Sequence, residues 1–255
     1  MNPLKAAFIT WVILLGELAV GWLWPHSATA KPQVLLAATE YPPYYGEHLP
    51  KQGPITEIIR ESFNISGYAV VIDFLPWKRA LEATRRGEYD ALYSAWYRQD
   101  RTRWFVFSDP LPIANQIGFF KRIDSKISYR TLEDLRPYKI GIVRGYSNPV
   151  KFSQAGLDVE AVTDDYLNMK KLAAGRIDLV LIDKVIGQYI IHTELPKSAP
   201  QLEWLDPPVA IEKQYLIFSK KASHFAVKCA AFNRGLRKLI ESGRAKKIIA
   251  SLGFR

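Results

Sequence analysis

Two parts of the sequence combine residue types that bind charged groups. Arg98, Arg101 and Arg103 lie within six residues, and Asp183 directly follows the apolar run Leu-Val-Leu-Ile. The planar fork of an arginine matches a carboxylate, and an aspartate at the end of a strand can receive an ammonium group. Spacing alone favours surface roles for the arginines, and it also allows Asp183 to cap the helix that follows. These residues therefore indicate a binding chemistry that the fold has to assemble.

The residue patterns of common enzymes and metal sites do not occur. His48, His192 and His224 have no mutual ligand spacing, and no CxxC, HExxH, GxSxG, Walker A or GxGxxG motif is present. The run Gly-Ile-Val-Arg-Gly that starts at Gly141 lacks the third glycine of a nucleotide-binding turn. We therefore expect no metal, no cofactor and no catalysis. A nucleophile–histidine–acid arrangement assembled by the fold stays open.

The charge balance of the chain is basic. Lysine and arginine outnumber aspartate and glutamate by 35 to 25, a net charge of +10. Nucleic acid, an anionic membrane or an acidic ligand would each suit this balance. The basic residues are spread from Lys51 to Arg255 without a block of five like charges, which favours a solvated basic surface. The single cysteine, Cys229, excludes an intramolecular disulfide, and we expect a buried, inert thiol.

The first thirty residues have the pattern of an export signal. Lys5 precedes an apolar stretch over residues 6–24, and Ala28-Thr29-Ala30 follows as a small-residue cleavage site. Glu17 interrupts the stretch, and an uncleaved anchor helix is the alternative reading, although a charge near the bilayer centre is costly. We expect cleavage after Ala30 and a mature protein outside the cytoplasm, where a nucleic-acid partner is not expected.

After the signal, short apolar strands alternate with amphipathic helices. This alternation predicts βαβ units, mostly parallel sheets and an α/β fold. Ser147 is expected to open a helix, and the chain is expected to be helical from His224, with a break at residues 241–243. The predicted strands are 33–39, 68–74, 90–94, 139–143, 159–163, 178–182 and 215–219, and the predicted helices are 55–63, 77–86, 131–135, 165–174 and 185–193.

The alternation restarts near residues 116–123, which divides the chain into two lobes. We expect residues 31–117 and 219–255 to form the first lobe, and residues 118–218 to form the second lobe with hinge segments. Open α/β sheets bind ligands at the carboxyl ends of their strands. Two such edges that face each other would form a cleft for a small molecule.

Several motifs together resemble those of the bacterial extracellular solute-binding proteins of family three, the periplasmic receptors of polar amino-acid ABC importers. The motifs are Thr-Glu-Tyr-Pro-Pro-Tyr-Tyr, Gly-Glu-Tyr-Asp-Ala, an arginine six residues before Phe-Ser-Asp-Pro, Gly-Ile-Val-Arg-Gly-Tyr-Ser-Asn and Ala-Gly-Arg-Ile-Asp. The resemblance implies a two-lobed, type II periplasmic-binding-protein fold with two hinge crossings. It also implies a periplasmic monomer that delivers its ligand to a membrane permease.

The resemblance assigns site residues position by position. It implies that Arg101 binds the carboxylate of an amino-acid-like ligand, and that Asp183 meets the ammonium group. Ser147 and Asn148 would offer a helix N-terminus to the same carboxylate, which the helix dipole favours. The remaining matched positions are the hydroxyl of Ser94 and the rings of Tyr41 and Trp77, which would face each other across the ligand.

Some residues depart from the family pattern. Trp96 stands where a serine is common, and Arg98 stands where a threonine is common. Arg98, together with Arg144 from the second lobe, would suit a ligand with additional negative charge or one other than a standard amino acid. Glu40 either binds a ligand cation or closes the loop that follows it.

Three functions fit the sequence, and a solute receptor for an ABC importer is the first. A stand-alone periplasmic sensor or binding protein is the second, because the same fold serves as a sensing module. An enzyme related to dehydratases on this scaffold is the third, with Glu40 or Asp183 as the acid or base.

Overall fold

The computed structural model describes residues 30–250. The chain divides into two units, Met1–Lys31 and Pro32–Arg255, and the second contains every helix and strand described below. The predicted signal peptide lies outside the described residues except for its last position, Ala30. No described helix is long and apolar enough to cross a membrane.

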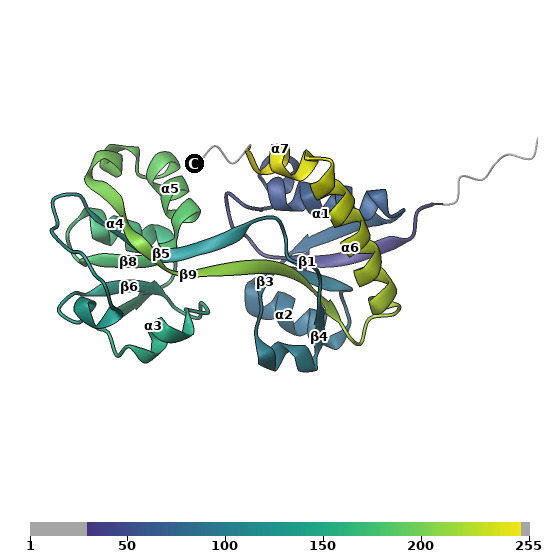
Figure 1. The fold of residues 1–255 in the computed structure, drawn as a ribbon, viewed down its shortest axis with the longest axis horizontal. Coiled ribbons are helices and arrows are strands. Elements are labelled where there is room, and N and C mark those ends of the chain that lie inside the picture. The colour runs from purple at the N-terminus through teal and green to yellow at the C-terminus, as the bar shows by residue number, and fades with distance from the viewer. Residues whose placement is uncertain (1–29, 251–255) are drawn as a thin grey trace, which may run out of the picture. The chain divides into compact units, whose positions relative to one another are not determined.

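The first lobe is built on three parallel strands (Figure 1). Strand β1 (Gln33–Ala38) lies between β2 (Ala69–Phe74) and β3 (Ala91–Trp96). Helix α1 (Pro54–Ile65) connects β1 to β2, and α2 (Trp77–Arg86) connects β2 to β3. Both helices serve as the crossover connections that parallel strands require. Helix α2 ends at Gly87, which adopts the left-handed conformation that a C-terminal glycine allows.

The second lobe repeats this plan. Strand β6 (Ile140–Val143) runs parallel to β7 (Val159–Val162) on one side and to β8 (Leu179–Asp183) on the other. The helices between and after these strands are α3 (Val150–Gln154), α4 (Asp165–Ala173) and α5 (Lys184–Thr193). The carboxyl ends of β6, β7 and β8 therefore lie at one edge, where α3, α4 and α5 follow the strands.

Two strands carry the chain between the lobes. Strand β5 (Ala114–Arg122) pairs with β8, and the 18-residue strand β9 (Leu202–Ser219) pairs with β5 and then with β3. The pairing partner of β9 changes from β5 to β3 between Lys213 and Gln214. Eight of the nine strands follow the order β2-β1-β3-β9-β5-β8-β6-β7. The ninth, β4 (Phe105–Phe107), pairs with β9 on the edge opposite β3.

The C-terminal helices return to the first lobe. Helix α6 (Phe225–Glu241) packs against α1, and a Cβ atom on Gly235 would lie 1.8 Å from the carbonyl oxygen of Ser62. Only glycine permits this approach. Helix α7 (Arg244–Ala250) follows after a break. Four 3₁₀ segments complete the described elements: Pro50–Gln52, Gln99–Arg103, Leu132–Leu135 and Pro196–Gln201.

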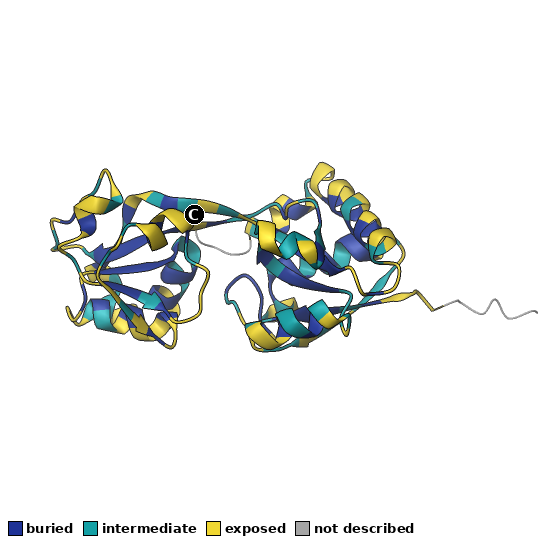
Figure 2. Cartoon of the chain, turned by 90° about the horizontal axis from the view of Figure 1, so that it is seen from below, coloured by how far each residue is buried: buried dark blue, intermediate teal, exposed yellow. Residues whose placement is uncertain are grey.

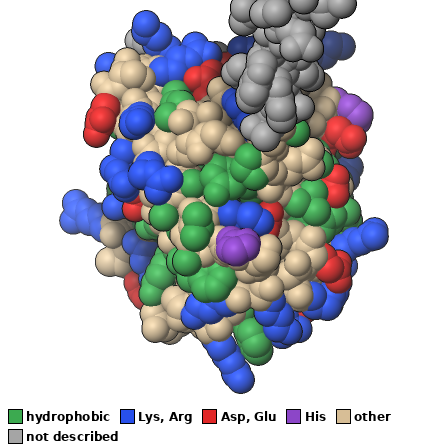
Figure 3. Space-filling model, turned by 90° about the vertical axis from the view of Figure 1, so that its right-hand side faces the viewer, with side chains coloured by type: hydrophobic (Ala, Val, Ile, Leu, Met, Phe, Trp, Pro, Cys, Tyr) green, Lys and Arg blue, Asp and Glu red, His purple; other side chains and the backbone are tan. Residues whose placement is uncertain are grey.

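Apolar side chains from strands and helices form the interior of each lobe, and Figure 2 shows the strands as mostly buried and the outer helix faces as exposed. Phe63, Phe218 and Phe232 meet in the first lobe, whereas Phe119 and Phe152 meet in the second. Cys229 is buried as predicted, and burial raises the pKa of its thiol to about 11. Lysine and arginine side chains are scattered over the face shown in Figure 3.

The predicted strands and helices are confirmed in order, but three strand segments were not predicted. These are β4, β5 and the first part of β9. Asp206-Pro207-Pro208 lies within β9, and prolines ordinarily argue against a strand. The structure accommodates them because residues 206–209 stand opposite the single Gly118 of β5, where the Trp204 ring leaves no room for a side chain.

One helix start was also predicted wrongly. Helix α3 begins at Val150 with Pro149 as its N-cap, so Ser147 does not open it. Residues 144–149 form a turn and loop instead. The preference of a residue before proline for extended backbone explains this difference, because Asn148 precedes Pro149.

Candidate functional site

Asp183 lies at the point where β8 ends and α5 begins. Its side chain is 3% exposed and caps α5 by accepting hydrogen bonds from the amides of Val185 (2.9 Å) and Ile186 (3.1 Å). The remaining donors come from other elements: the Tyr44 hydroxyl at 2.8 Å, the Asn115 amide at 3.1 Å and the Gln116 backbone at 3.0 Å. Burial raises the pKa of Asp183, and these hydrogen bonds offset part of the increase.

Arg101 lies in the 3₁₀ segment that follows β3. Its Nη1 donates to the Trp96 carbonyl oxygen at 3.1 Å, and its guanidinium lies 5.4 Å from the centre of the Trp77 ring. Burial lowers the pKa of Arg101, and the charge of Arg98 lowers it further. Within residues 30–250, no carboxylate forms an ion pair with Arg101, although eleven such contacts join other side chains. Its charge therefore remains available to an anion.

Asn115 connects the cationic and acidic ends of the site. It is 1% exposed and lies on the crossing strand β5. Its Oδ1 accepts from the Trp96 indole at 2.8 Å, and its Nδ2 donates to Asp183 at 3.1 Å. Because Arg101 bonds to the Trp96 carbonyl, a path of hydrogen bonds runs from Arg101 to Asp183. Sequence analysis missed Asn115, since no motif surrounds it.

Tyrosine rings from the first lobe cover Asp183. Tyr41 stacks on Tyr44 with ring centres 5.6 Å apart and also contacts Tyr45 at 5.7 Å. Tyr44, which was not predicted, places its hydroxyl on Asp183. Glu40 accepts a hydrogen bond from the Glu47 amide at 2.9 Å and closes the loop, which is one of the two roles considered for it.

Ser94 joins a second polar contact on the crossing strands. Its hydroxyl donates to Oε1 of Gln214, a fully buried residue on β9. The Nε2 atom of Gln214 is buried without a hydrogen-bond partner among the described residues. Trp77, Ser94, Trp96 and Arg101 therefore lie in one region of the first lobe, beside β9 and β5.

Other predicted residues lie apart from this region or are engaged elsewhere. Ser147 and Arg144 are exposed, Asn148 is half-buried, and Arg144 donates to the Ala161 carbonyl oxygen at 3.4 Å. Arg98 lies over the Trp96 ring at 5.4 Å and 3.7 Å from Glu212, so an acid of the protein offsets its charge. No hydrogen bond or ion pair joins Arg144, Ser147 or Asn148 to the other candidate residues in the described part of the chain.

A second buried acid lies near Asp183. Asp165 begins α4 and is 9% exposed. Burial raises the pKa of Asp165 to about 7, although the Tyr146 side chain favours the ionised carboxylate, and the charge of Asp183 contributes to the increase. No sequence motif marked Asp165 as a site residue. The preceding Asp164 caps α4.

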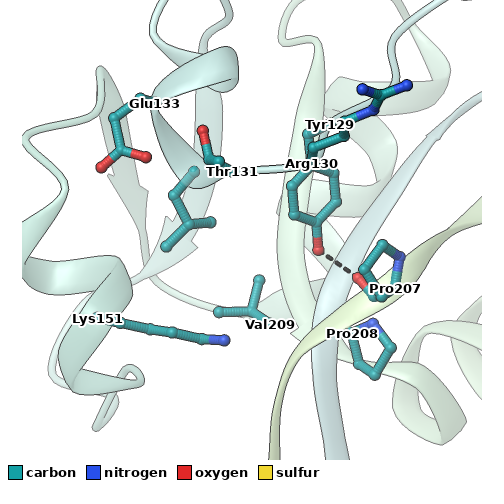
Figure 4. Close-up of a pocket in the computed structure, with 9 residues that line it drawn as sticks. Tyr129, Arg130, Thr131, Glu133, Lys151, Pro207, Pro208 and Val209 are labelled. Atoms are coloured by element: carbon teal, nitrogen blue, oxygen red, sulfur yellow. Dashed lines mark hydrogen bonds between the residues drawn. The ribbon is translucent and has the colours of Figure 1, made fainter.

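A surface pocket of about 320 Å³ lies elsewhere on the second lobe (Figure 4). Its lining includes Tyr129, whose hydroxyl donates to the Pro207 carbonyl oxygen, together with Arg130 and Lys151. None of the predicted site residues lines it. Among residues 30–250, no group of three or more His, Cys, Asp and Glu residues could hold a metal ion.

The fold is that of the type II periplasmic binding proteins, two-lobed proteins that hold a ligand between the lobes. The family model of the bacterial extracellular solute-binding proteins, family 3, matches residues 34–252. The chain belongs to this family, as its motifs indicated, and its role is to bind a small solute. No curated protein sequence matches it significantly.

Solved structures confirm the fold at low sequence identity. A histidine kinase sensor domain similar to periplasmic binding proteins has a TM-score of 0.72 and 23% identity, over 88% of this chain and 96% of that one. A mutant of ArgBP from T. maritima has a TM-score of 0.69 and 20% sequence identity, over 86% of this chain and 94% of that one. A third structure is described for glutathione import via GshT and the cystine ABC importer TcyBC of Streptococcus mutans. It has a TM-score of 0.70 and 21% sequence identity, over 88% of this chain and 95% of that one.

Proposed function

We propose that this protein is a periplasmic receptor that binds an amino-acid-like zwitterion between its lobes and delivers it to an ABC importer without changing it chemically. The observation that supports this most is the path that joins an unpaired guanidinium, Arg101, to a buried carboxylate, Asp183, through Trp96 and Asn115. Opposite charges at the two ends of one site match the two charged groups of an α-amino acid.

Each end has the chemistry that its ligand group needs. Arg101 would bind the carboxylate with its planar fork, and Ser94 would add a hydroxyl. At the other end, the ligand ammonium would replace the Tyr44 hydroxyl on Asp183, an exchange of a neutral donor for a charged one. Tyr41 and Trp77 would flank the ligand stem, and Ser147 and Asn148 would approach its carboxylate when the lobes close.

Ligand binding would shift an equilibrium between open and closed lobes. The lobes that we propose are residues 31–117 with 219–255, and residues 118–218. The return crossing would flex where β9 exchanges β5 for β3, between Lys213 and Gln214. A closed monomer would then present a surface to the permease. Two similar structures support this role: one is an ancestral arginine-binding protein bound to arginine, and the other is described for glutathione import via GshT and a cystine ABC importer.

A thermal-shift screen of residues 31–255 tests the binding role. The probes are amino acids, opines and small carboxylates, and a ligand at a hundredfold excess over its Kd stabilises the protein by about 2.7 kcal/mol. We expect a zwitterion to shift the melting temperature and Arg101→Ala to abolish the shift. Arg103→Ala is the matched control, because Arg103 lies two residues away over the Trp104 ring. An unchanged shift in Arg101→Ala would contradict the carboxylate assignment.

A stand-alone sensor is the second candidate, and the similarity to a histidine kinase sensor domain favours it. The two candidates differ in their partner. Genes for a permease and an ATPase beside this one, and ligand-dependent stimulation of that ATPase by the receptor, would support the importer. A lone gene would support the sensor. Conversion of any bound ligand to a product would revive the dehydratase-like alternative.

A further inference from the structure

Gln214 lies on the long crossing strand β9, at the residue where this strand begins to pair with β3 (Figure 1). It is fully buried, and its backbone carbonyl oxygen accepts a hydrogen bond from the Leu111 amide at 2.8 Å. Lys213, the residue before it, still pairs with Ala114 of β5. The proposed flexing of β9 between these two residues would leave Gln214 beside β3, in the lobe that carries Arg101.

The side-chain amide of Gln214 is only partly used inside the protein. Its Oε1 accepts a hydrogen bond from the Ser94 hydroxyl. Its Nε2 carries two donors, and within residues 30–250 it is buried without a hydrogen-bond partner. Buried polar atoms are nearly always hydrogen-bonded, because their removal from water otherwise costs free energy. The unused donors therefore indicate an acceptor that comes from a bound molecule.

Two further groups with unused donors lie around Trp96, the residue that pairs with Gln214 across β3 and β9. Arg101 donates to the Trp96 carbonyl oxygen at 3.1 Å and has no acidic partner among residues 30–250. Arg98 lies over the Trp96 ring at 5.4 Å, and its Nη2 is buried without a hydrogen-bond partner in the same range. Glu212 contacts the other nitrogen of Arg98, Nη1, at 3.7 Å. Nitrogen donors therefore predominate here, which favours a ligand group with acceptor oxygens.

The pairing of the strands directs the Gln214 amide toward this region. Residues directly opposite each other in an antiparallel pair share one face of the sheet, with their Cβ atoms about 4.5–5.5 Å apart. Gln214 therefore lies on the same face as the Trp96 side chain, which also bonds to Asn115 at 2.8 Å. Asn115 in turn donates to Asp183 at 3.1 Å, so this face carries both charged ends of the proposed site.

We propose that Gln214 is a ligand-binding residue whose side-chain amide donates a hydrogen bond to the carboxylate that Arg101 binds. This inference rests on the proposed zwitterion receptor and adds to it a residue of the crossing strand that no sequence motif marks. Trp96 stands where a serine is common, so this chain lacks that hydroxyl, and the Gln214 amide directly opposite supplies a donor in its place. The bond from Ser94 to Oε1 fixes the amide and leaves Nε2 for the ligand.

Replacement of one amide atom tests this contact. Gln214→Glu keeps the size and shape of the side chain but replaces the Nε2 donor by a carboxylate oxygen, which repels a ligand carboxylate. Gln214→Met removes the donor without adding a charge. Gln201→Glu is the matched control, because it makes the same chemical change at an exposed position of the 3₁₀ segment Pro196–Gln201.

The probes are the standard L-amino acids and the carboxamide of each one that binds, which keeps the side chain and the amino group but lacks the carboxylate. Titration calorimetry on residues 31–255 at pH 7 measures both dissociation constants for every variant. We expect Gln214→Glu to lower the preference for the carboxylate over the carboxamide by about tenfold or more, the effect of a hydrogen bond to a charged group. Gln214→Met should lower this preference by a smaller factor, and Gln201→Glu should leave it unchanged.

The preference between the two probes separates a binding role of Gln214 from a structural one. A variant that only disturbs the packing of β9 weakens both probes by the same factor, and equal losses would overturn the inference. An unchanged preference in both Gln214 variants would also overturn it, and the receptor role stands if Arg101→Ala still abolishes binding. If no amino acid binds the wild type, both are wrong. If circular dichroism shows that Gln214→Glu does not fold, Gln214→Met decides.

Discussion

The two lobes contribute opposite charges to the region between them. The first lobe supplies Arg101, half-buried beside tryptophan rings, and the second lobe supplies the buried acids Asp165 and Asp183. Within residues 30–250, no acid forms an ion pair with Arg101, and no lysine or arginine forms one with either aspartate. The first-lobe cation lies on a short 3₁₀ segment, whereas both acids occupy the starts of helices. This difference indicates that charge complementarity is left for a ligand to complete, since no described side chain of opposite charge forms an ion pair with Arg101 or with either acid.

Among the charged groups of the site, Asp183 should have the largest effect on the free energy of unfolding. Asp183→Ala removes the cap of α5, leaves the Tyr44 and Asn115 donors buried without their acceptor, and removes the acceptor of the Gln116 amide. We expect the free energy of unfolding to fall by about 3 kcal/mol. Urea denaturation without ligand measures it. Asp164→Ala, which removes only the exposed cap of α4, should cost about 1 kcal/mol. If the two variants lost equal free energies of unfolding, the hydrogen bonds of Asp183 to Tyr44, Asn115 and Gln116 would contribute nothing to stability.

Asp165 should affect stability in the opposite direction, with a dependence on pH. Because its pKa is raised to about 7, the folded protein binds a proton there that the unfolded chain releases near its ordinary value. Stability should therefore fall as the pH rises from 4 through 7. Asp165→Asn should remove this fall and stabilise the ligand-free protein at pH 8, by at most about 4 kcal/mol. Melting curves from pH 5 to 8 measure it, and a constant difference between variant and wild type would contradict the assignment.

Tyr44 should give the smallest effect, because only its hydroxyl group joins the first lobe to Asp183 of the second lobe. Tyr44→Phe removes one of five hydrogen bonds to Asp183 and retains the ring. We expect a loss of about 1 kcal/mol in the free energy of unfolding. Ligand association, followed by stopped-flow fluorescence, should become faster if the hydroxyl holds the site closed. Tyr41→Phe is the matched control, since the Tyr41 ring stacks on Tyr44 but makes no hydrogen bond to Asp183. Unchanged association in Tyr44→Phe would exclude this role.

Local sequence accounted for most of the elements in each lobe. Periodicity and stop signals predicted α2 at its observed limits, and the predicted helix 165–174 exceeds α4 by a single residue. These signals act over a few residues, so they do not depend on the tertiary surroundings of the helix. The crossing strands escaped prediction because their pairing partners lie far along the chain, and because the two prolines of β9 are tolerated only opposite Gly118.

The alternation of strands and helices, the family and the candidate charges Arg101 and Asp183 could all be predicted from the amino-acid sequence. The connection between those charges depends on contacts that form only in the folded protein. Tyr44 and Asp183 are 139 positions apart, and Asn115 and Asp183 are 68 apart, so no local pattern can report their hydrogen bonds. The burial of Asp165 also became evident only from the structure. An aspartate in the first turn of a helix is ordinary in a sequence, and nothing in its local pattern reports that folding buries the side chain.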